Sequence, residues 1–218
     1  MAIFRPILYI NKKFHFYKLL GCGQKGSFQL HPDWNQYGII TVNNSEDFSS
    51  SILQSDYTAW KQWYYGKFIS SWWKFLGVET WTIVLKPITS HGRWNGVELF
   101  NNISEPYKGG QIAVLTRASI RPSKAIEFWK NIASVEQEIV NTKGLKFSVG
   151  IGEMPLLRQA TFSVWTDMDS MKSFAYERLQ HQTVIRKTRE RNWYSEELFA
   201  RFIPLQTAGS LRGGNPIG

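Results

Sequence analysis

The sequence has a single cysteine, Cys22, and no long uninterrupted run of apolar residues. One cysteine excludes an internal disulfide and gives no sign of an oxidising compartment. The sequence contains no stretch of about 18 apolar residues, which a membrane-spanning helix needs, and its N-terminus lacks the apolar run of a signal peptide. We therefore expect a cytoplasmic protein, which would meet the inner membrane only peripherally.

Acidic residues are also scarce. The chain has 17 Asp and Glu against 26 Lys and Arg, a net charge of +9 and a pI near 9.6. Such a surface can attract nucleic acid, an anionic bilayer or an acidic protein. The densest basic run, Arg186–Arg191, falls at the end of a predicted helix, where cations complement the helix dipole. Because no zinc-finger, helix-turn-helix or RNA-binding signature accompanies the charge, we expect no nucleic-acid partner.

Aromatic residues are abundant, at 15% of the chain with ten tryptophans. They can line a pocket for a large flat or apolar ligand, or simply fill a core with large side chains. Composition alone leaves both interpretations open. The hydrophobic fraction of 43% excludes a disordered chain, and 218 residues suffice for one large domain or two smaller ones.

Residues 109–208 carry the clearest pattern. Leu145, Phe147, Val149 and Ile151 alternate with small or polar residues, which is typical of a strand. The whole segment predicts a βαββαβ unit, the ferredoxin-like order. Its expected strands are 111–120, 145–151, 159–166 and 197–206, and its expected helices are 122–140 and 170–191. Residues 209–218 contain four glycines and a proline, and we expect them to form a flexible tail.

Residues 1–108 repeat this unit incompletely. Phe14–Gly23 resembles Gly144–Gly152, Gly38–Val42 resembles Ala160–Val164, and Trp81–Pro87 would be the closing strand. Too few residues precede Phe14 for a full strand and helix, so this repeat is predicted to lack its first strand and most of its first helix. The expected fold class is α+β, with two ferredoxin-like repeats of the dimeric α/β-barrel type. An open sheet edge needs cover, which a second copy in a homodimer could supply.

The helix predicted at 170–191 places a histidine on its apolar face. At about 100° per residue, His181 points in the same direction as Phe174 and Ile185. Such a histidine is either a hydrogen-bonded core residue or a neutral imidazole offered to a metal or haem iron. Arg178 on the same face suits a carboxylate such as a haem propionate. The facing strand leaves room for a flat ligand, through its small residues Ser148, Gly150 and Gly152.

Three other patterns have a chemical and a plain interpretation. Residues 21–26 match G-x-G-x-x-G, but Pro32 blocks the helix that a dinucleotide site needs, which favours a glycine-rich hairpin. His31 and Asp33 have the spacing of two ligands in a two-histidine, one-carboxylate iron site, or are turn residues. Cys22 is a core residue or a thiolate ligand of haem.

Six segments resemble the spheroidene monooxygenase family of carotenoid biosynthesis, in order from about Phe16 to Gly214. They are Tyr17–Gly21, Thr89–Gly96, Ala113–Ala118, Gly152–Pro155, Arg158–Trp165 and Trp193–Phe202. The resemblance implies a haem-containing oxygenase related to the dimeric α/β-barrel proteins. It also implies successive hydroxylation of an acyclic carotenoid to a C-2 ketone, with O₂ and reduced ferredoxin. In related haem proteins the proximal histidine comes from the last helix of the unit, which corresponds to His181.

The resulting hypothesis is a haem-dependent monooxygenase with an iron ligand at His181. The other residues expected at the cofactor are Arg178, Phe174 and Ile185, and the catalytic candidates are Arg117, Arg158 and His91. The two arginines, on neighbouring strands, would bind a propionate or donate to O₂. His91, in a loop rich in glycine and aromatic residues, is an alternative ligand, a distal group or an ordinary turn residue. The competing hypothesis is a non-catalytic α/β-barrel protein that binds haem or an apolar ligand.

Overall fold

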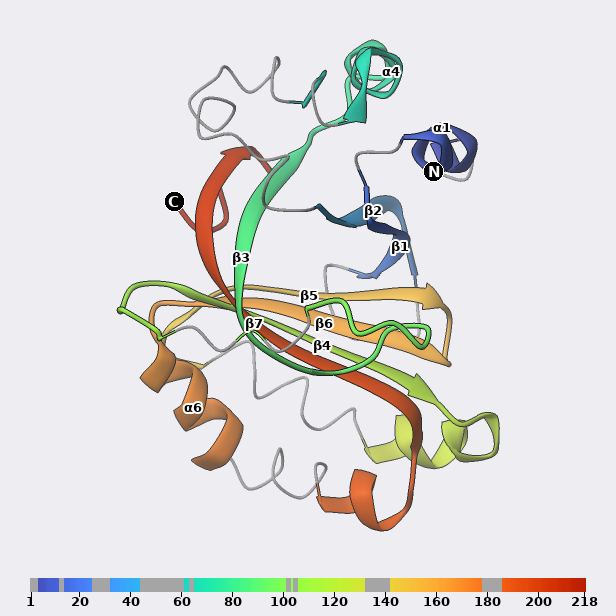
Figure 1. The fold of residues 1–218 in the computed structure, drawn as a ribbon, viewed down its shortest axis with the longest axis vertical. Coiled ribbons are helices and arrows are strands. Elements are labelled where there is room, and N and C mark those ends of the chain that lie inside the picture. The colour runs from blue at the N-terminus through green and yellow to red at the C-terminus, as the bar shows by residue number, and fades with distance from the viewer. Residues whose placement is uncertain are drawn as a thin grey trace. The chain divides into compact units, whose positions relative to one another are not determined.

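The computed structural model describes residues 4–11, 14–24, 32–43, 61–62, 65–100, 103, 106–131, 142–177 and 186–218. The fold is α+β, as predicted (Figure 1). Its elements are α1 (Arg5–Ile10), β1 (Phe16–Gly23), β2 (Pro32–Val42), α4 (Lys67–Phe75), β3 (Trp81–Gly92), β4 (Ile112–Ile120), the short 3₁₀ helix η4 (Pro122–Lys124), β5 (Leu145–Met154), β6 (Arg158–Trp165), α6 (Met168–Glu177) and β7 (Tyr194–Gly209).

The chain forms two compact units that share several strands. Unit 1 contains residues 1–19, 39–84 and 205–218, and unit 2 contains residues 20–38 and 85–204. Four strands, β1, β2, β3 and β7, have residues in both units. The predicted boundary between residues 108 and 109 separates the two sequence repeats, whereas these units are defined by how compactly the chain packs. The predicted boundary therefore stays a prediction.

Unit 2 has the strand order of a ferredoxin-like repeat. Its strand segments lie in the order β2-β1-β5-β6-β4-β7-β3, so β5, β6, β4 and β7 are neighbours in the order that a βαββαβ unit adopts. Figure 1 shows these four strands side by side, with α6 against them. Pairing is antiparallel: Leu115 lies opposite Phe162 on β6 and Ala200 on β7. At the far edge of β5, Gly21 pairs with Gly152. The strand order expected of a ferredoxin-like repeat is therefore present, and the bounds of the C-terminal unit, 109–208, stay a prediction.

The helix starts of unit 2 follow from single residues. Proline at position 122 opens η4, and an α-helical run continues to residue 131. Asp167 caps α6, because its Oδ1 accepts the N–H of Ser170 at 2.7 Å. That bond, with the Thr166 hydroxyl, lowers the pKa of the Asp167 carboxyl.

A core of apolar side chains fixes α6 on the sheet of unit 2. Met171 and Phe174 are buried against a strand cluster made up of Ile88, Ile112, Val114 and Trp165. The rings of Phe174 and Trp165 are 5.3 Å apart. Side chains thus fill the interface between this part of the helix and the sheet. A second cluster, Ile120, Phe128 and Trp193, lies where the first helix follows β4.

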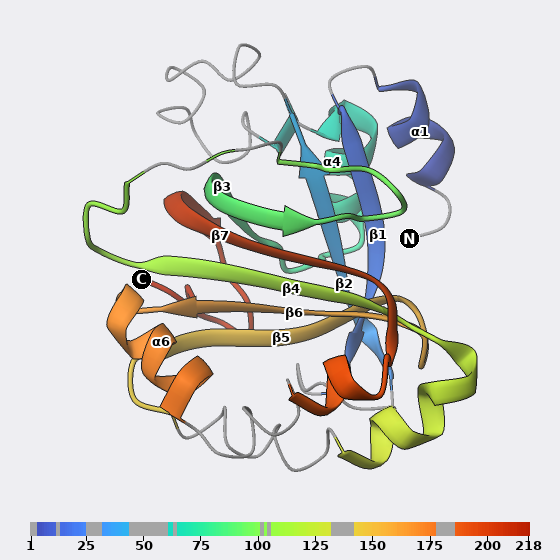
Figure 2. The same ribbon diagram turned by 60° about the horizontal axis from the view of Figure 1, so that its bottom comes forward.

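Unit 1 is built around two short helices that lie side by side (Figures 1 and 2). Phe4, the residue before α1, and Leu8 of α1 pack with Tyr65 and Ile69. The Phe4 ring also meets Trp73 edge-on, at 6.3 Å between centroids. The buried positions of α4 all lie on one side, so the helix presents its other side to solvent.

Residues 209–218, for which the sequence predicts flexibility, have a defined conformation in unit 1. Leu211 and Gly214 bridge across a two-residue turn, and Ile217 is buried. The Trp81 indole donates to Thr207 at 2.6 Å and to Asn215 at 3.2 Å. Flexibility concerns motion in solution, and for this segment it stays a prediction.

Candidate functional site

The candidate site of unit 2 is centred on a buried arginine. Arg117 on β4 is 1% exposed, and its guanidinium forms an ion pair with Glu196 of β7. Its Nη2 atom lies 3.4 Å from Oε1 of Glu153 on β5 and 3.3 Å from Oδ1 of Asn95. One cation therefore joins two carboxylates that come from separate strands. A buried charge needs such partners, since an unpaired one would lose its hydration without compensation.

Trp94 contacts both Arg117 and Glu153. The guanidinium carbon of Arg117 lies 5.5 Å from the centre of its ring, a cation–π geometry. The indole N–H donates to Glu153 Oε1 at 2.7 Å, and the side chain is fully buried. The carboxylate of Glu153 thus contacts both the arginine and the tryptophan. We call Trp94, Arg117, Glu153 and Glu196 the Arg117 network.

A tight turn after β3 brings Trp94 to this position. Trp94 and Val97 bridge across Asn95 and Gly96, whose φ angles of 53° and 77° are those of a type I′ turn. The sequence Asn-Gly suits this turn because both central residues need positive φ. The turn points its two central N–H groups at Glu196, with donor–acceptor distances of 2.9 Å and 2.6 Å.

Gly92, at the end of β3, lets the turn dock on β7. Its φ is 87°, and a Cβ there would lie 2.9 Å from the carbonyl carbon of Glu197. The next residue, Arg93, donates its N–H to that carbonyl at 2.7 Å. Only glycine permits both the positive φ and the close approach. Arg93 also forms an exposed ion pair with Glu98, at 2.9 Å.

The environment of Glu196 favours its charged form. Burial by itself would raise the pKa of this carboxyl, but the N–H groups of Gly96 and Asn95 and the guanidinium of Arg117 outweigh it and lower the pKa. Glu196 is therefore a carboxylate at neutral pH, paired with the guanidinium of Arg117. Such a cluster fixes the relative positions of three strands and a turn, and it orients Arg117.

The catalytic candidates fall into two places. Arg117 lies opposite Leu198 and Ala160, whereas Phe199 lies opposite Thr116, so Arg117 and Phe199 are on opposite faces of the sheet. His91 stacks on Phe199, with 5.2 Å between ring centres and an interplanar angle of 25°. The structure therefore does not bring His91 and Arg117 together.

Arg158 belongs to the same face as Arg117. It lies opposite Ser119, two residues beyond Arg117 on β4, and its side chain is exposed. The predicted adjacency of the two arginines on neighbouring strands is correct. Their chemical states differ, because Arg117 is already paired with protein carboxylates. The catalytic roles of Arg117, Arg158 and His91 stay predictions.

The structure describes only one of the four residues expected at a haem. Phe174 packs into the core against Trp165, and so it is covered by protein. His181, Arg178 and Ile185 lie outside the described residues, as does His31. In the described part of the chain, no group of three or more His, Cys, Asp and Glu side chains could hold a metal ion.

One of the small residues expected to make room for a ligand has a simpler explanation. A Cβ on Gly152 would lie 2.9 Å from the carbonyl oxygen of Arg158 and 2.9 Å from the side chain of Gln159. Glycine is needed there because β6 approaches closely at an irregularity of the ladder. The described residues between α6 and the sheet therefore do not fit a haem, and a haem site that includes His181 stays a prediction.

Sequence reasoning missed Trp94, Glu153 and Glu196 as site residues. A signal was present: four of the six segments that resemble the spheroidene monooxygenase family each contribute to this one cluster. They are Thr89–Gly96, Ala113–Ala118, Gly152–Pro155 and Trp193–Phe202. Segments this far apart in sequence converge only after β3, β4, β5 and β7 have paired.

Comparison with known proteins explains the shared segments. The chain is 33% identical to spheroidene monooxygenase of Rhodobacter capsulatus over 219 aligned positions, which cover 100% of this chain and 86% of that protein. It is 31% identical to spheroidene monooxygenase of Rubrivivax gelatinosus, over 91% of this chain and 72% of that protein. The chain belongs to the spheroidene monooxygenase family.

The counterpart from Cereibacter sphaeroides is 33% identical over 94% of this chain and 60% of that longer protein. No family model matches the sequence. Solved structures give only distant likenesses. Protein FN1347 of Fusobacterium nucleatum aligns over 94% of this chain and 84% of its own, with 15% identity and a TM-score of 0.45. A mutant of SnoaB, a cofactor-independent oxygenase from Streptomyces nogalater, covers 44% of this chain and 95% of its own, with 15% identity and a TM-score of 0.37.

Proposed function

We propose that this protein is a monooxygenase that hydroxylates an acyclic carotenoid twice at C-2, giving a ketone. The observation that carries the proposal is the 33% identity to a spheroidene monooxygenase across this entire chain. The Arg117 network adds support from within the structure, since family-like segments supply all of its members. O₂ would be the co-substrate.

The reaction has a simple balance. Each hydroxylation inserts one oxygen atom of O₂ into a C–H bond and releases the other as water, using two electrons and two protons. A second hydroxylation at the same carbon gives a geminal diol, which loses water to form the ketone. The electrons require a donor, and we propose a ferredoxin-type protein. Its acidic surface would be attracted to a chain with a net charge of +9.

Haem is the proposed cofactor, and it would supply the activation of O₂. Its proposed iron ligand is His181, with Arg178 at a propionate and Ile185 beside the ring. These three assignments rest on the sequence. Phe174, the fourth residue proposed at the cofactor, is packed against Trp165 in the described structure. For the protein's own residues, we propose that the Arg117 network holds β4, β5 and β7 in register around the substrate-binding region.

The carotenoid assay tests the function directly. Expression in a host that makes an acyclic carotenoid and supplies reduced ferredoxin should give a product heavier by one oxygen and lighter by two hydrogens. Arg117→Met, which leaves Glu153 and Glu196 without their cation, should abolish the product. Haem uptake without any product would favour the competing hypothesis of a non-catalytic binding protein.

A spectroscopic experiment tests the cofactor separately. Protein purified with haem supplied should show a Soret band that His181→Ala removes or shifts, whereas His91→Ala should keep it. A wild-type protein that stays colourless after haem titration yet forms the ketone would overturn haem and leave the oxygenase function standing.

A further inference from the structure

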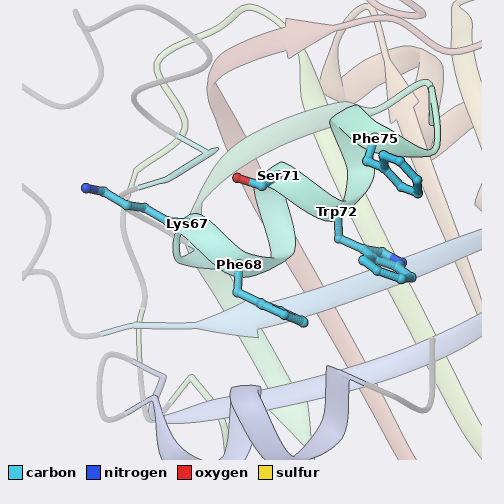
Figure 3. Close-up of a pocket in the computed structure, with 5 residues that line it drawn as sticks. All are labelled: Lys67, Phe68, Ser71, Trp72 and Phe75. Atoms are coloured by element: carbon cyan, nitrogen blue, oxygen red, sulfur yellow. The ribbon is translucent and has the colours of Figure 1, made fainter.

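Helix α4 presents an aromatic surface to solvent. Phe68, Trp72 and Phe75 are 56%, 38% and 80% exposed, and Figure 3 shows them projecting to the same side of the helix. The rings of Phe68 and Trp72 are nearly parallel at 6.4 Å, and those of Trp72 and Phe75 are 6.0 Å apart. A surface hollow of about 500 Å³ lies along these residues. We call the three side chains the α4 aromatic face.

The helix also has a side that packs into the core, so the exposed aromatic side chains are additional to its core-facing residues. Ile69 and Ser70 are buried, and Trp73 packs beside Phe4 and Tyr65. The helix thus has an apolar inner side in unit 1 and a second apolar side facing outward. Leu76 and Val78, which follow the helix, are also exposed. A contiguous exposed apolar surface of this kind is characteristic of an interaction site.

The charged residues of α4 are both lysines, which indicates a binding partner with negative charge. The sequence of α4, KFISSWWKF, contains two lysines and no acidic residue. At about 100° per residue, Lys67 and Lys74 fall together on one flank of the aromatic face. In Figure 3, Lys67 projects away from the rings. Helices that lie in the interface of an anionic bilayer typically have exposed Trp and Phe side chains beside lysines, and few or no acidic residues.

We infer that α4 is a membrane-docking helix, which inserts Phe68, Trp72 and Phe75 into the headgroup region of an anionic bilayer. Lys67 and Lys74 would contact lipid phosphates from the flank. In the described part of the chain, no helix is long and apolar enough to cross a membrane, so α4 would lie on the bilayer surface. The membrane binding itself does not depend on the proposed function. Only the purpose of that binding, access to a carotenoid dissolved in the bilayer, rests on the proposed function.

A second copy of this chain is the less suitable occupant. Two copies that met through this face would bring Lys67 and Lys74 of both together without an acidic residue of α4 to pair with them. An anionic bilayer provides the opposite charge. α1, which packs against α4 through Phe4 and Trp73, likewise exposes Tyr9 and Ile10 and has Arg5 at its start.

Vesicle flotation of the full chain tests the inference. Wild-type protein should float with vesicles of phosphatidylglycerol and phosphatidylethanolamine, and much less with phosphatidylcholine vesicles. The double variant Trp72→Ser, Phe75→Ser should bind the anionic vesicles at least about tenfold more weakly. Lys67→Gln and Lys74→Gln should each reduce binding by about fivefold. Trp34→Ser, which removes another exposed tryptophan but lies on β2, is the matched control and should float like the wild type.

The outcomes separate this inference from the proposed function. Wild-type protein that binds neither vesicle, or a double variant that binds as well as the wild type, overturns the membrane role. A concentration-dependent dimer that the double variant abolishes identifies a second copy as the occupant and also overturns it. If the membrane role is correct, the double variant should keep its carotenoid turnover in detergent micelles and lose it with substrate in vesicles. Flotation without turnover in either form would leave the docking helix intact and refute the oxygenase proposal.

Discussion

Two turns in this protein share one design and differ in what supports it. In unit 2, the central N–H groups of the Asn95-Gly96 turn donate to Glu196. In unit 1, the N–H groups of Arg212 and Gly213 donate to Glu79, at 2.8 Å and 2.7 Å. Both turns have positive φ at both central residues. The two turns differ in the surroundings of the capping carboxylate: Glu196 forms an ion pair with the buried Arg117, whereas Glu79 is exposed.

The correspondence extends along the strands that carry the two turns. Gly92 ends β3 with φ 87° and Gly209 ends β7 with φ 83°. The residue after each glycine donates its N–H to the backbone carbonyl that follows the capping glutamate: Arg93 to Glu197 at 2.7 Å, and Ser210 to Thr80 at 3.0 Å. The internal repeat is thus preserved in backbone geometry, although its side chains have diverged. The turn with the buried cation is the one that family-like segments surround.

The largest expected effect comes from removing that cation. Arg117→Met leaves the carboxylates of Glu153 and Glu196 without their partner, and it should reduce the free energy of unfolding by about 3–5 kcal/mol. Chemical denaturation measures the loss. Adding Glu196→Gln and Glu153→Gln should recover part of it, because the uncompensated charges are then gone. A loss that is unchanged in the triple variant would mean that packing, not charge, is what Arg117 provides.

Replacing the two capping glutamates compares the turns directly. Glu196→Gln should cost about 1–3 kcal/mol, since it weakens an ion pair and two hydrogen bonds to a half-buried carboxylate. Glu79→Gln, at an exposed site, should lower the melting temperature less. Equal shifts for the two variants would show that Arg117 adds nothing to the first turn.

Backbone strain provides a control in which the turns should not differ. Gly96 and Gly213 have φ of 77° and 81°, and a Cβ at either would meet no atom within 4 Å. Alanine at each should therefore cost about 1–2 kcal/mol through backbone strain alone. Similar losses in both variants would confirm that the two turns differ only in their surroundings, whereas a much larger loss at Gly96 would contradict it.

Lowering the pH should give the smallest loss of stability, and the two capping glutamates should contribute to it. The carboxyl pKa values of Glu196 and Glu79 both lie below the ordinary 4.5. A carboxyl whose pKa is lower in the folded chain adds stability above its unfolded pKa and loses it as the pH falls through the folded value. Stability should decline below about pH 4.5, and less steeply in Glu196→Gln than in the wild type. A parallel decline in both would mean that Glu196 does not contribute to acid sensitivity.

Local patterns were sufficient to predict the order of the strands in the second half of the chain. The alternation in β5 depends only on neighbouring residues, and the structure has this strand where the sequence predicts it. The boundaries were less well predicted. β7 extends from Tyr194 to Gly209, longer than expected at both ends, because pairing with β4 and the turn at its end extend it beyond its apolar pattern.

The sequence by itself determined the α+β class, the βαββαβ order and the family. Those properties depend on periodicity and on short segments that can be recognised one at a time. Only the tertiary structure decided that Trp94, Arg117, Glu153 and Glu196 form one cluster, and that Phe174 packs against Trp165. The partners of a buried charge come from strands distant in sequence, and strand pairing alone brings them together. The aromatic face of α4 was equally hidden, because apolar residues on both sides of a helix do not reveal which side meets the core.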